Sequence, residues 1–179
     1  PGVTETSGQI TFTVTITNLC GGTASDTYTL TILPAPTPTV TASIPSATIC
    51  NGSSITLTAS GGTSYSWLAP VASTNTVTVS PTTSTVYTVD VTNGCSTTQT
   101  TFSVTVNQLP VITAANTGAY CAKDSIHLSE TSTTGFTYSW TGPNSFASGI
   151  QNPFIANSTA ANAGTYSLIV TNGGCPSPA

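Results

Sequence analysis

An internal repeat with a period of roughly 75 residues constrains this chain more than any other feature. Two copies of one motif, Ser64-Tyr65-Ser66-Trp67 and Thr137-Tyr138-Ser139-Trp140, each lie between a preceding cysteine and a following Tyr…Asn-Gly…Cys run. The strand-and-turn part occurs three times, at 12–20, 87–95 and 166–175. An array of similar small domains explains this periodicity, because the same unit then recurs at a fixed spacing.

The repeat also places the domain boundaries. We predict that residues 1–34 are the C-terminal strands of a truncated domain, 35–107 a complete domain, and 108–179 a domain that lacks its last strand. The joints at 33–38 and 107–110 contain proline, which stiffens short linkers. A chain that begins Pro1-Gly2 and contains no methionine is expected to be an internal piece of a longer protein.

Composition and alternation predict an all-β chain. Threonine supplies 40 of the 179 residues, and the apolar residues are mostly valine, isoleucine and leucine. Threonine, valine and isoleucine are β-branched, and such side chains suit a pleated, half-buried surface. Alternation of polar and apolar residues recurs at 11–17, 74–80 and 102–106, and no stretch has helical spacing with a cap. Short strands with frequent turn signals indicate β-sandwich domains.

Charge excludes several classes of partner. Lys123 is the one basic residue against five acidic ones, and the net charge is −4. A single cation cannot neutralise a phosphate backbone, so no nucleic-acid partner is expected. No apolar run approaches the ~20 residues of a membrane helix, so we expect no direct membrane insertion. A surface of hydroxyls and amides fits an extracellular location.

One motif resembles a corner of the immunoglobulin fold. Residues 163–168, Ala-Gly-Thr-Tyr-Ser-Leu, resemble the Asp-x-Gly-x-Tyr-x-Cys corner in which a tyrosine hydroxyl ties two strands together. Leu168 stands where that motif has cysteine, and Val89 does so beside Tyr87.

Longer stretches at 142–166 and 48–67 resemble the Ig-like, PKD-like repeats of large surface proteins made by gliding, type IX-secreting bacteria. The resemblance covers nearly the whole chain. It implies tandem immunoglobulin-like β-sandwiches on a bacterial cell surface, in a giant adhesin or another multidomain secreted protein. Its motifs carry no catalytic signature.

Aromatic residues divide into a repeated and an unrepeated group. The aromatics at repeated positions are predicted to fill the cores: Trp67, Trp140, Tyr87 and Tyr166. The alternative is that the two tryptophans are exposed and stack on sugars. The others occur only in 108–179 and are either a ligand-binding patch or, as we favour, extra packing under that domain: Tyr120, Phe136, Phe146 and Phe154.

The five cysteines are expected to form structural disulfides in an oxidising compartment, since their spacing matches no zinc pattern. We favour pairing within each repeat, Cys50 with Cys95 and Cys121 with Cys175, and expect the partner of Cys20 outside the chain. An alternative stays open. In an immunoglobulin strand order, the turn before the second strand and the turn before the last strand lie at opposite poles. The two cysteines of one repeat would then be too far apart to bond, because bridged Cα atoms must lie within about 7 Å. That order would allow Cys50 to reach Cys175 across the joint.

The sequence offers few candidate catalytic residues, and no cofactor or metal is expected. His127 is the one histidine, and the neighbouring alternation turns it outward. A serine nucleophile would therefore lack a base. Asp124 and Glu130 are not close enough along a strand to be taken as a carboxylate pair, and Asp90 belongs to another repeat. We predict that the chain is not an enzyme.

Ser125 is a candidate modification site. Asp124-Ser125-Ile126 resembles the acidic O-glycosylation acceptor of these secretion lineages. The sequons at Asn51 and Asn157 are more simply explained by chance in a chain rich in serine and threonine.

Three functions fit these features. The preferred one is a structural stalk whose partners are the neighbouring Ig-like domains of the same long chain. The second is a module that binds surface glycan or protein through the unrepeated aromatics. The third is a subunit of an extracellular filament, in which a strand of another chain completes the domain at 108–179.

Overall fold

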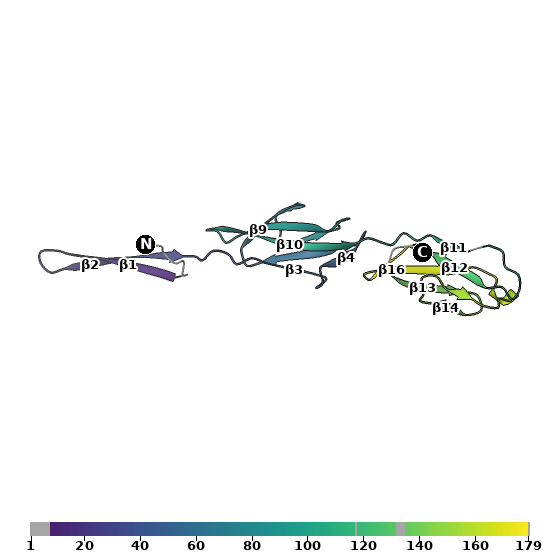
Figure 1. Ribbon diagram of the computed structural model, residues 1–179. Coiled ribbons are helices and arrows are strands. Elements are labelled where there is room, and N and C mark those ends of the chain that lie inside the picture. The colour runs from purple at the N-terminus through teal and green to yellow at the C-terminus, as the bar shows by residue number, and fades with distance from the viewer. Residues whose placement is uncertain (1–7, 117, 132–134, 179) are drawn as a thin grey trace. The chain divides into compact units, whose positions relative to one another are not determined.

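Strands make up nearly all of the regular structure in the computed structural model, which describes residues 8–116, 118–131 and 135–178 (Figure 1). The exception among the described residues is one turn of 3-10 helix, η1 (Ala160–Asn162). No helix of this described part is long and apolar enough to cross a membrane.

Two compact units divide the chain. One holds the chain up to Thr41 together with 58–77 and 88–101, and the other holds 42–57, 78–87 and the chain from Phe102 onward. The proline joint at 107–110 therefore lies within one unit, together with Cys50 and Cys175.

The first two strands, β1 (Gly8–Thr17) and β2 (Thr23–Ile32), form an antiparallel hairpin. Phe12 pairs with Tyr28 and Ile10 with Leu30, so the apolar side chains share one face and threonines cover the other. Both faces are exposed, including 52% of Phe12.

The next eight strands form two sheets. In chain order they are β3 (Thr39–Ala42), β4 (Thr48–Cys50), β5 (Ile55–Ser60), β6 (Ser64–Leu68), β7 (Val71–Ala72), β8 (Thr76–Val79), β9 (Thr85–Thr92) and β10 (Thr97–Asn107). One sheet has the order β3-β5-β8, and the other β4-β10-β9-β6-β7. Strand β4 runs parallel to β10, so the first strand is split between the sheets. This is the ABE and GFCC′ order of immunoglobulin domains.

The last seven strands repeat that order. They are β11 (Ala114–Asn116), β12 (Ile126–Glu130), β13 (Thr137–Gly142), β14 (Phe146–Ser148), β15 (Phe154–Ile155), β16 (Ser167–Asn172) and β17 (Cys175–Pro176). Their sheets are β11-β12-β15 and β14-β13-β16-β17. The strand in the last position, β17, has 2 residues where β10 has 11.

Alternating burial shows that the sheets between β3 and β10 each bury one face. Trp67 on β6 is fully buried, and its indole Nε1 donates to the carbonyl of Thr74 over 3.1 Å. Other buried side chains of these strands come from both sheets: Ile55, Leu57, Ala59, Val77, Val79, Tyr87, Val89, Val91, Val104 and Val106. The repeated tryptophan is thus a core residue here and not a surface platform.

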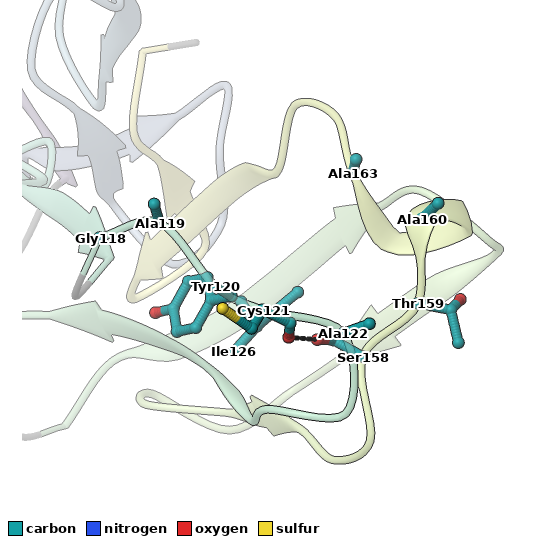
Figure 2. Close-up of a pocket in the computed structure, with 10 residues that line it drawn as sticks. All are labelled: Gly118, Ala119, Tyr120, Cys121, Ala122, Ile126, Ser158, Thr159, Ala160 and Ala163. Carbon is teal, nitrogen blue, oxygen red and sulfur yellow. Dashed lines mark hydrogen bonds between the residues drawn. The ribbon is translucent and has the colours of Figure 1, made fainter.

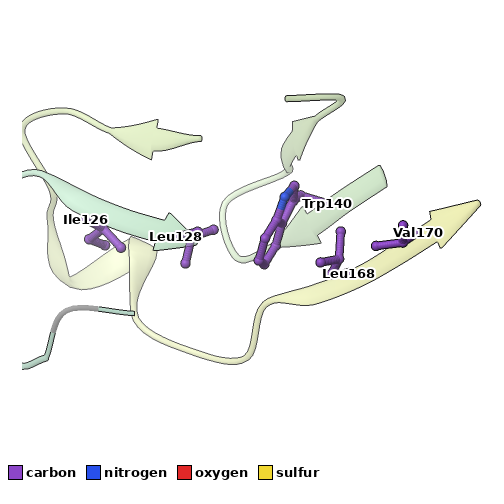
Figure 3. Close-up of a cluster of buried hydrophobic side chains, with 5 residues drawn as sticks. All are labelled: Ile126, Leu128, Trp140, Leu168 and Val170. Carbon is purple, nitrogen blue, oxygen red and sulfur yellow. The ribbon is translucent and has the colours of Figure 1, made fainter. Parts of the chain in front are cut away.

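In the set of strands from β11 to β17, Trp140 occupies the position that Trp67 has in the preceding set. It is 2% exposed and lies in a cluster drawn from β12, β13 and β16 (Figure 3): Ile126, Leu128, Trp140, Leu168 and Val170. Its Nε1 donates to the carbonyl of Gln151 over 3.2 Å. Leu168 and Val89 are buried, so aliphatic packing replaces the inter-sheet cysteine of the immunoglobulin corner at both positions.

Tyr166 makes the hydrogen bond expected of that corner. Its hydroxyl donates to the carbonyl of Asn162 over 2.8 Å, and its ring lies edge-on to Phe146. Tyr166 is half-buried, whereas its counterpart Tyr87 is 6% exposed. Burial raises the pKa of both phenols above the usual 10.0, because the phenolate loses solvation.

Candidate functional site

A disulfide joins the end of β4 to the start of β17. Cys50 and Cys175 are separated by 125 residues in sequence, and their Cα atoms are 5.5 Å apart. The bond therefore connects strands on either side of the 107–110 joint, and we call it the cross-joint disulfide.

The preferred pairing of cysteines within each repeat is wrong. Cys95 and Cys121 are exposed free thiols in the described structure, as is Cys20. The strand order gives the reason. Cys50 ends the first edge strand, whereas Cys95 lies in the turn between β9 and β10, at the other end of those strands. The alternative pairing of Cys50 with Cys175 is the one present.

Backbone and side-chain amides surround the cross-joint disulfide. The Asn107 Nδ2 donates to the carbonyl of Gly173 over 3.1 Å, and the Asn172 Nδ2 donates to the carbonyl of Gln108 over 3.1 Å. Asn51 also bonds this segment: its backbone N–H donates to the Asn107 carbonyl over 2.9 Å, and its Nδ2 donates to the Gln108 Oε1 over 2.9 Å. These groups are all neutral, so the joint contains no titrating contact among them.

Gly173 is required by this close approach. Its φ of +52° lies in the left-handed region, and a Cβ there would overlap the side-chain amide of Asn107. The Asn172-Gly173 pair therefore forms the turn before β17 and also contacts the joint segment at 107–108.

Sequence reasoning missed the asparagines and the glutamine of this site. It interpreted Asn172-Gly173 as a turn signal and Asn107-Gln108 as part of a linker. One sequence signal was available: amide side chains lie close to Cys175, at Asn172, and close to Pro110, at 107–108.

A similar contact occurs at the earlier joint. The Nδ2 of Asn93, in the β9–β10 turn, donates to the carbonyl of Pro34. Asn93 and Asn172 hold matching positions in the repeat, and Pro34 and Gln108 each follow the last strand of the preceding set. The asparagine of this turn thus contacts the preceding linker at both joints.

The four unrepeated aromatics do not form one exposed patch. Tyr120, Phe136 and Phe146 pack against the buried cluster around Trp140. Phe154 is 63% exposed and stacks on the ring of His127, with ring centroids 5.9 Å apart.

The polar candidates are dispersed. The Asp124 carboxylate accepts the backbone N–H of Cys121 over 2.9 Å, and Ser125 beside it is half-buried. Glu130 is 3% exposed and accepts the backbone N–H of Thr113 over 3.2 Å. His127 is exposed. Within the described ranges no three His, Cys, Asp or Glu side chains gather where they could hold a metal ion.

Comparison with known proteins gives no family. No protein-family model matches the chain, and no curated protein matches it. Among solved structures, titin domains A168–A170 align with a TM-score of 0.41 at 16% identity, over 94% of this chain and 70% of that one. The amphioxus IgVJ-C2 molecule aligns with a TM-score of 0.37 at 17% identity, over 72% and 94% of the two chains. The titin domains z1z2 in complex with telethonin align with a TM-score of 0.33 at 16% identity, over 80% and 92%.

The fold class is assigned from the strand order itself. This is an all-β chain with an immunoglobulin-like sandwich fold. Three features assign it: the ABE and GFCC′ strand order, the buried tryptophans on β6 and β13, and the tyrosine corner.

Proposed function

We propose that this chain is a non-catalytic stalk segment of a large secreted bacterial surface adhesin, built from tandem immunoglobulin-like domains at 1–34, 35–107 and 108–179. The cross-joint disulfide is the observation that carries the proposal. A bond that connects strands before and after a joint limits bending and extension there, which is what a spacer under load requires.

The position of the bond gives the stalk a specific mechanical property. Tension applied to the two ends can pass from Cys50 directly to Cys175, so the 125 residues of sequence separation do not bear it. An extended chain spans about 3.4 Å per residue, so about 400 Å of contour length inside the loop cannot extend under tension while the bond is intact. A stalk built in this way keeps its length even when a domain unfolds.

Composition supports the same function. Charged residues make up 3% of the chain, so its surface carries few ionised groups. Such a surface responds little to changes in salt, because there are few charges to screen. The disulfide also fits an oxidising extracellular compartment.

Single-molecule pulling between the chain ends tests the proposal. We expect the oxidised chain to release only the residues outside the Cys50–Cys175 loop, and the reduced chain to release about 400 Å more. The Cys95→Ser variant is the control and should behave like the parent chain. Equal contour lengths with and without reductant would contradict the mechanical role.

A binding module receives less support. Three of the four unrepeated aromatics pack against the core, and Phe154 with His127 leaves a single small aromatic surface.

A further inference from the structure

Every Asn-Gly pair of this chain lies in a turn that contacts a joint. The pairs are at 51–52, 93–94 and 172–173. At the joint with the disulfide, Asn51 Nδ2 donates to the Gln108 Oε1 over 2.9 Å, and Asn172 Nδ2 donates to the Gln108 carbonyl over 3.1 Å. At the earlier joint, Asn93 Nδ2 donates to the Pro34 carbonyl. All three side-chain amides are therefore used as hydrogen-bond donors to a linker.

Asparagine followed by glycine is the pair most prone to deamidation. The main-chain nitrogen of the glycine attacks the side-chain Cγ of the asparagine, and the new C–N bond closes a five-membered succinimide. The Cγ–Nδ2 bond breaks, and ammonia leaves with the proton of the glycine N–H. Water then opens the ring to give aspartate or isoaspartate, so water is the one co-reactant. Glycine permits the attack because it has no Cβ and its backbone adopts many conformations.

The contacts with Gln108 oppose this reaction. Ring closure requires Cγ to swing onto the main-chain nitrogen of the next residue, so each side-chain amide must first leave Gln108. After Asn172 the glycine is restrained as well, since the Asn107 Nδ2 donates to the Gly173 carbonyl over 3.1 Å and lies where a Cβ of Gly173 would be. Both asparagines therefore react only after the joint segment has moved away.

The cross-joint disulfide keeps that segment in place. Asn51 directly follows Cys50, and Asn172 lies three residues before Cys175. Both turns donate to Gln108, and the disulfide ties the two turns to each other, so opening the joint requires all three connections to yield together.

Asn93 provides an internal comparison. Its Nδ2 bonds a linker in the same way, and its Oδ1 accepts the N–H of Cys95 over 3.1 Å. The joint that it contacts holds no disulfide in the described part of the chain, and Cys95 is a free thiol. Its rate of deamidation is therefore independent of the cross-joint disulfide.

A turn of similar form in the last set of strands lacks the reacting pair. In the turn at 121–124, Ala122 stands where the turn at 50–53 has Asn51 (Figure 2). The N–H of the fourth residue donates to the carbonyl of the first in both turns, over 3.1 Å and 2.9 Å respectively. The turn itself thus does not require Asn-Gly, and the pair occurs where its amide bonds the joint.

We infer that Asn51 and Asn172 form a deamidation site that is guarded by the cross-joint disulfide. While the bond is intact, both side chains stay on Gln108 and ring closure is slow. Once the joint opens, the succinimide forms and the asparagines become aspartate or isoaspartate. The chemistry depends on the joint contacts alone, and it rests on the proposed stalk function only where tension is what opens the joint.

Deamidation prevents the joint from closing as before. A carboxylate accepts hydrogen bonds and donates none. At position 172 it would face the Gln108 main-chain carbonyl, which also only accepts. At position 51 the Gln108 amide could turn its Nε2 to the carboxylate, but the Thr82 carbonyl would then lose the Nε2 that it accepts over 2.8 Å. Isoaspartate also lengthens the main chain of the turn, so an opened joint is permanently altered.

Peptide mapping by mass spectrometry measures all three rates in one chain. The parent chain and Cys50→Ser/Cys175→Ser are held at mildly alkaline pH and sampled over time. We expect Asn51 and Asn172 to deamidate about tenfold or more faster in the variant, because the bond no longer opposes opening. Asn93 should keep its rate. Unchanged rates at Asn51 and Asn172, or equal acceleration at all three asparagines, would overturn the inference.

A second variant keeps the disulfide and separates the two asparagines. Gln108→Ala removes the Oε1 that Asn51 bonds and retains the main-chain carbonyl that Asn172 bonds. Asn51 should therefore deamidate about two- to tenfold faster, the factor expected from one lost hydrogen bond, while Asn172 keeps its rate.

The matched control is Gln99→Ala, whose side chain bonds Asp90 and no joint residue, and it should change neither rate. No change at Asn51 in Gln108→Ala, or the same change at Asn51 and Asn172, would overturn the inference. The pulling measurement tests the stalk without reference to deamidation, so failure of this site is distinguished from failure of the stalk.

Discussion

The side-chain amide of Asn172 donates to the carbonyl of Gln108, 64 residues earlier in the chain, over 3.1 Å. Asn93 makes the same kind of contact with Pro34. In each case an asparagine in the turn before a last strand contacts the linker that enters its own set of strands. The neutral amides of these turns are thus joint residues, and they act beside the cross-joint disulfide at only one of the two joints.

Replacing Asn172 by alanine should loosen the joint without breaking the disulfide. One hydrogen bond contributes about 0.5–1.5 kcal/mol, so the disulfide should be reduced about two- to tenfold faster. Timed reduction followed by thiol alkylation and mass spectrometry measures that rate. The exposed Asn75→Ala is the control. An unchanged rate in Asn172→Ala would mean that the amide does not restrain the joint.

Removing the cross-joint disulfide should lower the free energy of unfolding. On the chain-entropy model the closure of a 100-residue loop is worth about 4.7 kcal/mol, and measured losses are about 2–5 kcal/mol. We expect a loss in that range for Cys50→Ser/Cys175→Ser in chemical denaturation. Cys95→Ser removes an exposed free thiol and should change little. A comparable loss in both variants would argue that the serines, and not the bond, are responsible.

The strands and cores could be predicted from sequence because their determinants are local. Alternating threonine and valine identifies the faces of β8 and β10, and the repeated tryptophan identifies the buried position on β6 and β13. The cysteine pairing could not be read in the same way. Repeat membership suggests which cysteines belong together, but the bond depends on which pole of the sandwich each turn occupies.

The joint contacts were beyond prediction for a related reason. Asn107, Gln108 and Asn172 are ordinary linker and turn residues in sequence. Their role arises only when the segment after β10 and the turn before β17 come together, and that placement is tertiary.

Tyr166→Phe should destabilise the last set of strands modestly. The substitution removes the bond to the Asn162 carbonyl and leaves the ring packed against Phe146, so we expect a loss of about 0.5–1.5 kcal/mol. Thermal or chemical unfolding measures it. Tyr28→Phe, on the exposed face of the hairpin, should stay within about 0.5 kcal/mol of the parent chain. No difference between the two variants would show that the corner bond contributes nothing net.

Gly142→Ala should be more costly than the loss of that hydroxyl. A Cβ at Gly142 would overlap the ring of Tyr166, and overpacking of this kind costs about 1–3 kcal/mol. The matched control is Gly149→Ala, where the nearest atom to an added Cβ is the Tyr138 carbonyl oxygen at 3.7 Å. If both variants unfold at the same denaturant concentration, the ring of Tyr166 moves aside at little cost.

Alkaline pH should destabilise the fold through the buried phenols. Burial raises the pKa of Tyr87 and Tyr166 above 10.0, so between the unfolded and folded pKa values the folded state holds more protons. Their contribution to stability is therefore complete below about pH 10 and is lost as the pH rises through the folded pKa. Denaturant titrations at a series of pH values should show this fall, and Tyr87→Phe should make it shallower, while Tyr28→Phe on the exposed hairpin should not. An identical pH dependence in the parent chain and Tyr87→Phe would mean that the Tyr87 phenol ionises as easily folded as unfolded.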